Sequence, residues 1–133
     1  MKSHLGKRVI ATATAGIVLL GATAALAGLK GGWPAYVYKS ADGSGYAFGS
    51  MAAIRGSGDS YQDIRCTITW ASANCSVTDS TGKYLGCQTT DPIMMAAART
   101  FGTDSGMQIN VNASGTCTGI YIYNFSAWAP KAP

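Results

Sequence analysis

The residues that could carry catalysis in this chain are few. Its only histidine, His4, lies in an N-terminal stretch with the character of a cleavable leader, and the chain contains no glutamate. Without histidine, the mature chain has no Ser-His-Asp or Cys-His nucleophilic site and no histidine ligand for a metal. We therefore expect neither a metal nor another cofactor.

Aspartate is the remaining acid or base. Asp104-Ser105-Gly106 matches the D-S-G of aspartic proteases, but it follows a predicted helix rather than an apolar strand, which favours a turn. Ser80-Thr81-Gly82-Lys83 matches S-x-x-K, whose chemistry requires a helix, whereas this stretch is expected at a hairpin tip. We name no catalytic residue and do not expect an enzyme. A small hydrolase using Asp79 or Asp104 is kept as the second alternative.

Tyrosine and tryptophan give a better indication of function. Tyr36 and Tyr38 alternate along one predicted strand, and Tyr121 and Tyr123 along another, so each pair projects to one face. If the two strands are neighbours, these tyrosines form an aromatic strip that could stack on sugars or anchor a protein. The alternative is ordinary cross-strand packing. We predict as binding residues Tyr36, Tyr38, Tyr121, Tyr123 and Trp128.

The N-terminus predicts export. Lys2, Lys7 and Arg8 precede an apolar stretch at residues 9–25, and Ala25-Leu26-Ala27 is an A-x-A cleavage motif. Residues 1–27 are therefore expected to be a signal peptide. The mature protein is expected to be secreted or periplasmic, with no membrane segment after cleavage.

Cleavage also changes the charge. The whole chain carries a net charge of +4, but without residues 1–27 seven basic residues stand against six aspartates, a net charge of +1. No basic cluster remains that would favour nucleic acid or an anionic membrane. The remaining length suits a single domain, expected at residues 28–128, with a mobile tail at 129–133.

Four cysteines in an exported chain of this size indicate two disulfides. Their spacing lacks any C-x-x-C pair, which disfavours a metal site. The pairing stays open. Strand neighbours favour Cys75–Cys87 with Cys66–Cys117, and the sequential pairing of Cys66–Cys75 with Cys87–Cys117 is equally compatible.

Strands must position these residues. Apolar residues alternate with polar ones at 64–70 and at 75–87, which predicts strands with Cys66, Cys75, Cys87 and Trp70 on an inner face. Gly82 is expected in the left-handed position of a three-residue hairpin loop, and another turn is expected at 41–45. Further strands are predicted at 34–38, 46–54, 108–111 and 118–125, with a turn at 112–115.

A short helix interrupts the strands. Asp91 can cap it, Pro92 suits its first position, and Gly102 can end it. A buried stripe is expected from Met94, Ala97, Ala98 and Phe101. The predicted fold is mainly β: a small antiparallel β-sandwich or sheet with one short helix and two disulfides.

Part of the chain resembles a group of small secreted four-cysteine bacterial proteins of no established function. The resemblance covers roughly residues 46–128 and rests on 49–55, 59–62, 64–66, the pattern C-x-V-x-D-x-x-G-x-x-L-x-C at 75–87, 115–117 and 124–126. It implies a secreted domain framed by four cysteines and implies no catalytic residue. At Gly56 the chain departs from the group, which carries a polar residue there.

These observations together predict a secreted, non-enzymatic binding or interaction module. Its expected partner is a polysaccharide or an unknown protein, with a cell surface or a carbohydrate as the target of the aromatic strip. The first alternative is an inhibitor of a secreted enzyme, which would present the loop ending at Lys83 to a trypsin-like pocket.

Overall fold

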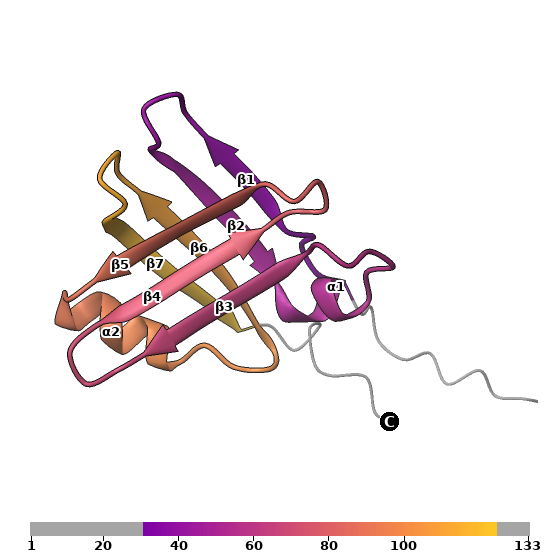
Figure 1. Ribbon diagram of the computed structural model, residues 1–133. Helices are drawn as coiled ribbons and strands as arrows, with labels where there is room; N and C mark the ends of the chain where they lie inside the picture. The colour runs from indigo at the N-terminus through magenta and orange to yellow at the C-terminus, as the bar shows by residue number, and fades with distance from the viewer. Residues whose placement is uncertain (1–30, 125–133) are drawn as a thin grey trace, which may run out of the picture.

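The computed structural model describes residues 31–124, which form seven strands and two short helices (Figure 1). The signal peptide, Trp128 and the tail predicted from the sequence lie outside these described residues. In chain order the elements are β1 (Tyr36–Lys39), β2 (Gly45–Ser50), α1 (Met51–Arg55), β3 (Asp63–Ile68), β4 (Ala73–Thr78), β5 (Tyr84–Thr89), α2 (Pro92–Arg99), β6 (Ser105–Val111) and β7 (Cys117–Asn124).

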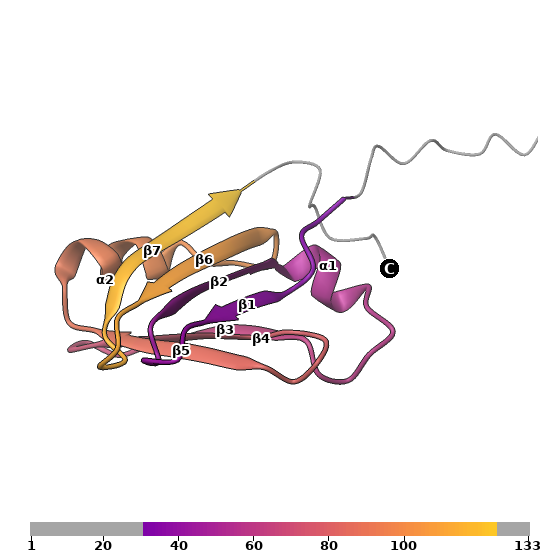
Figure 2. The ribbon, with the colours of Figure 1, turned by 90° about the horizontal axis from the view of Figure 1, so that it is seen from above.

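The strands build two antiparallel sheets. One has four strands in the order β1-β2-β6-β7, and the other has three in the order β3-β4-β5. The sheets stack as two layers whose strands cross, and α2 lies at one end of the stack (Figures 1 and 2). The prediction of a mainly β, antiparallel sandwich with two disulfides and a short helix after Asp91 is confirmed, and the structure adds the five-residue helix α1.

The core fills the space between the inner faces of the two sheets. Strand alternation places one residue in two on each inner face, so each sheet contributes a row of apolar side chains. Met107, Ile109 and Val77 are completely shielded from solvent, and α2 covers one end of the core with Met95 and Ala98.

The disulfides join the cysteines in sequential pairs. Cys66 and Cys75 face each other across β3 and β4, with their Cα atoms 4.1 Å apart, and Cys87 of β5 is bonded to Cys117 of β7. The short Cα separation suits the non-hydrogen-bonded pairs of an antiparallel ladder, where side chains approach most closely. The second bond links the two sheets. Two disulfides indicate that the protein folds in an oxidising compartment.

Three hairpins turn through the same kind of loop. Each loop has three residues and ends in a glycine with positive φ: 89° at Gly43, 83° at Gly82 and 80° at Gly115. In each, the residue before the loop donates its backbone N–H to the residue after it, at 2.8–3.1 Å. The turns predicted at 41–45, 80–82 and 112–115 are therefore confirmed. Glycine ends each loop because it adopts this conformation without strain.

Two of these loops are anchored by the same set of hydrogen bonds. The Asp79 Oδ1 accepts from the amide and hydroxyl of Thr81 and from the amide of Lys83, at 2.6–3.0 Å. The Asn112 Oδ1 accepts in the same way from Ser114 and Thr116, at 2.8–3.1 Å. Asp79 is charged and buried, whereas Asn112 is neutral and half-buried.

The charge makes the Asp79 turn sensitive to acid. Burial raises the pKa of Asp79, but hydrogen bonds from Thr81 and Lys83 and the charge of Lys83 outweigh burial and bring it below its ordinary value. A carboxylate with a lowered folded-state pKa contributes stability that is present above its unfolded pKa and lost as the pH falls through the folded one. We expect Asp79→Asn to keep the loop but to lose less stability than the wild type between pH 6 and about pH 2.5, measured by urea unfolding.

The reciprocal change Asn112→Asp supplies the control. It places a carboxylate in the equivalent turn and should steepen the loss of stability in acid. Hydrogen bonds from Ser44 and Gln62 also lower the pKa of Asp42 and Asp59, so both variants retain part of the wild-type pH dependence. Identical pH profiles for the two variants would contradict this account.

Trp70 was expected in the core, and this prediction is wrong. Its side chain is 93% exposed. Strand β3 ends at Ile68, and a hydrogen bond of 2.8 Å from the Thr69 amide to the Ser72 carbonyl closes a turn that contains Trp70. The alternation that predicted burial therefore stops two residues before the tryptophan.

Two element ends also differ from expectation. The strand predicted at 46–54 ends at Ser50, whose buried hydroxyl caps α1 by accepting from the Ala53 amide at 3.4 Å. Helix α2 has the predicted cap and first residue, but it ends at Arg99, before Gly102. No helix within residues 31–124 is long and apolar enough to cross a membrane.

Candidate functional site

The four predicted tyrosines within the described residues lie on one sheet but not on neighbouring strands. Tyr36 and Tyr38 belong to β1, and Tyr121 and Tyr123 belong to β7. These are the two edge strands of the four-stranded sheet, with β2 and β6 between them. The predicted strip required the two strands to be neighbours, and this condition is not met. Alternation and register nevertheless place all four tyrosines on the same outer face.

Strand β2 extends the aromatic surface inward from β1. Tyr46 lies opposite Tyr38, and Phe48 lies opposite Tyr36. The ring centroids of these pairs are 5.3 and 5.4 Å apart, with interplanar angles of 26° and 30°. Rings inclined by this much at this centroid distance are offset-stacked, the arrangement that aromatic pairs favour. Each of these four rings therefore has part of its surface against another ring, and the three tyrosines also carry a hydroxyl group.

Trp33 connects this cluster to β7. Its ring makes edge contacts with Phe48 at 6.1 Å and with Tyr123 at 5.4 Å, so it spans β6, where the outward position is Gly106. The Trp33 backbone is held by Ser50 through hydrogen bonds in both directions, each of 2.9 Å. We call the resulting surface the outer aromatic face; it consists of Trp33, Tyr36, Tyr38, Tyr46, Phe48, Tyr121 and Tyr123.

The β7 side of this face has a different ring orientation. A Cβ atom on Gly119 would lie 2.8–3.1 Å from the far end of the Tyr121 ring, so that ring lies along its own strand over the glycine. Its other side faces solvent, and the residue is 47% exposed. Between the aromatic groups, Gln108 and Asn110 of β6 present amides that are hydrogen-bonded to each other at 3.2 Å.

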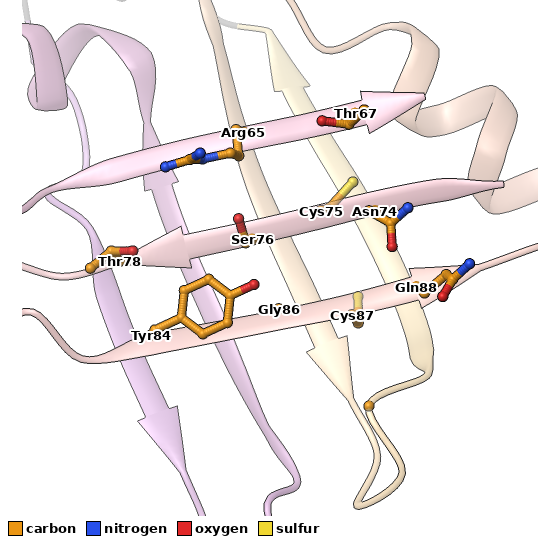
Figure 3. A pocket seen from close by; sticks show the side chains of 11 residues that line it. Arg65, Thr67, Asn74, Cys75, Ser76, Thr78, Tyr84, Gly86, Cys87 and Gln88 are labelled. Carbon is orange, nitrogen blue, oxygen red and sulfur yellow. The ribbon is translucent and has the colours of Figure 1, made fainter. Parts of the chain in front are cut away.

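A second candidate site lies on the other sheet and was not predicted. The outer face of β3-β4-β5 carries an open depression of about 500 Å³ (Figure 3). Its polar side chains come from all three strands, and the turn between β6 and β7 reaches one end of it through Gly115. The lining residues are Arg65, Thr67, Asn74, Cys75, Ser76, Thr78, Tyr84, Gly86, Cys87, Gln88 and Gly115.

Tyr84 dominates this depression. A Cβ atom on Gly86 would lie 2.2 Å from the Tyr84 hydroxyl oxygen and 2.8 Å from Cζ, so the ring lies over the glycine, as the view in Figure 3 shows. The residue is 57% exposed. The pattern that could have indicated this position is an aromatic residue two places from a glycine within a strand, because both then point to the same face.

This geometry gives little support to the catalytic alternatives. Asp79 follows β4 of one sheet and its carboxylate already holds a turn, whereas Asp104 precedes β6 of the other sheet. One Asp104 oxygen is buried without a hydrogen-bond partner among the described residues, but an acid–base mechanism needs a second group beside it. No cluster of three histidine, cysteine or acidic residues suited to a metal occurs within residues 31–124.

Comparisons with known proteins give no further guide. No protein-family model, no curated protein and no solved structure matches this chain.

Proposed function

We propose that the protein is a non-enzymatic binding module that attaches to an extended, neutral polysaccharide outside the cytoplasm through its outer aromatic face. The observation that carries this proposal is the contiguous set of ring contacts from Tyr38 to Tyr123 on a solvent-facing side of the sheet. Five aromatic residues of this face are 39–47% exposed. Exposed aromatic surface of this continuity is characteristic of interaction sites.

The composition of the face favours a neutral ligand. Among the outward-facing positions of β1, β2, β6 and β7, none carries a charged side chain. The groups on offer are tyrosine hydroxyls, the amides of Gln108 and Asn110, and the free side of the Tyr121 ring. Hydroxyls and amides can hydrogen-bond sugar hydroxyls, and an aromatic ring packs against their C–H groups.

Two further points support action after export. The predicted signal peptide would deliver the chain to the oxidising environment that its two disulfides require. The resemblance to small secreted four-cysteine proteins agrees with this location and brings no activity with it.

The test is retention of the mature, oxidised protein by insoluble cellulose, chitin and peptidoglycan. We expect binding to at least one polymer, and about a tenfold or greater loss of affinity when Tyr36 and Tyr121 are both replaced by alanine. Tyr121 is chosen rather than Tyr123, because the Tyr123 ring supports Trp33 and its loss would disturb the face itself.

Tyr61→Ala is the matched control. Tyr61 is 61% exposed and lies in the loop before β3, outside the outer aromatic face. It should be dispensable for retention. If a polymer retained the double variant as strongly as the wild type, the proposed binding face would be refuted. If no polymer retained the wild type, a protein partner would become the expected ligand.

A further inference from the structure

We infer that the depression on the three-stranded sheet is a second binding site, which takes a short neutral saccharide on the ring of Tyr84. It does not rest on the proposed role of the outer aromatic face, because the two surfaces belong to different sheets that face opposite ways (Figure 2).

The first argument is the orientation of Tyr84. One side of its ring rests on the backbone at Gly86, and the residue is 57% exposed. The tyrosines of β1 and β2 differ in that their rings stack on other rings. A ring with one supported side and one open side is a platform for the C–H groups of a sugar.

The second argument is the set of polar groups around that platform. The register places Ser76 beside Gly86 and aligns Thr67, Asn74 and Gln88 in the next row, all on the outer face (Figure 3). Hydroxyl and amide groups both donate and accept hydrogen bonds, as sugar hydroxyls do. A few polar groups that converge beside an aromatic surface are typical of small-molecule sites.

The third argument is charge. Among the described residues that line the depression, Arg65 alone is charged, and its Nε donates to Asp63 Oδ2 at 2.5 Å. Asp63 is not among the lining residues, but its carboxylate offsets the charge of Arg65, so a carboxylate or sulfate on the ligand gains little from this arginine. The remaining guanidinium N–H groups of Arg65 can still donate to a hydroxyl. A neutral saccharide therefore fits better than an acidic one.

The fourth argument is rigidity. Cys75 and Cys87 lie in the floor of the depression, and their disulfides tie β4 to β3 and β5 to β7. The backbone N–H of Gln88 also donates to the Gly115 carbonyl at 3.1 Å, which fixes the turn at the far end. A site held in place before binding loses little freedom when the ligand arrives.

Two glycine substitutions test the site with a matched pair. Gly86→Ala places a methyl group against the flexible end of Tyr84 and should lift its ring from the sheet, and Gly119→Ala should do the same to Tyr121 on the other sheet. The mature, oxidised protein would be titrated with cellotriose, chitotriose, mannotriose and trigalacturonate, and backbone amide shifts followed by NMR. We expect a neutral trisaccharide to shift amides of β3, β4 and β5, and Gly86→Ala to weaken this binding at least fivefold while Gly119→Ala leaves it unchanged.

Gln88→Ala is the second variant, since it removes an exposed amide without touching Tyr84, and it should weaken the same binding at least twofold. No shift with any neutral trisaccharide, shifts confined to the four-stranded sheet, or tighter binding of trigalacturonate than of every neutral sugar would each overturn the inference. If no saccharide binds the depression, the proposal that the outer aromatic face retains a polymer still stands. If Gly119→Ala loses polymer retention, the inference about the depression still stands.

Discussion

Replacing Cys87 and Cys117 together by alanine is expected to lower the free energy of unfolding by about 3–4 kcal/mol. The bond closes a sequence separation of 30 residues and connects β5 of one sheet to β7 of the other. The Cys66–Cys75 bond spans only 9 residues and joins strands that are already paired by hydrogen bonds. Chain-entropy reasoning gives about 2–3 kcal/mol for this shorter loop.

Urea unfolding of the two double variants, each with its remaining disulfide intact, measures the difference. Both are compared with the wild type at the same pH. The inter-sheet variant should be the less stable of the two by about 1 kcal/mol. If the variant without Cys66–Cys75 proved equally unstable or less stable, loop length would not govern the contribution of these bonds.

Ile109→Ala is expected to lower the free energy of unfolding by about 2–5 kcal/mol. Ile109 is fully buried in β6, and its ladder partners are Ala47 of β2 and Ile120 of β7. Ala47 has no side chain that could extend into the space left behind. The cavity should therefore persist, which places the cost in the upper part of this range.

Ile109→Val is the graded control, with an expected loss of about 0.5–1.5 kcal/mol. Chemical denaturation of both variants provides the measurement, and equal losses for alanine and valine would show that the site collapses around the smaller residue. The disulfides remain formed in both variants, so the comparison isolates packing.

Short sequence patterns predicted the hairpin turns and the start of α2, because these features depend on residues close together in the chain. Gly82 at the third position of its loop and the Asp42-Gly43 pair identified two of the hairpins, because the left-handed conformation excludes most other residues. Asp91 and Pro92 identified the start of α2 through the amides that the aspartate caps. Trp70 shows the limit: alternation cannot tell where a strand stops and the chain reverses.

Pairing between distant segments was beyond the same reasoning. Cys75 lies opposite Cys66 in one ladder and opposite Cys87 in the next, so register alone could not choose between the two disulfide pairings. The order β1-β2-β6-β7 depends on contacts between β2 and β6, which local sequence does not encode. Alternation placed the predicted tyrosines of β1 and β7 on one outer face. Tyr46, which links β1 to the centre of the sheet, was left out of the predicted set.

The back-to-back arrangement of the two sheets has a consequence for valency. The outer aromatic face and the Tyr84 depression point away from each other (Figure 2), so a bulky ligand on one cannot shield the other. With both occupied, one small domain would act as a cross-linker between two glycan chains. Such a molecule would gather glycans into a network at low concentration and disperse that network when present in excess.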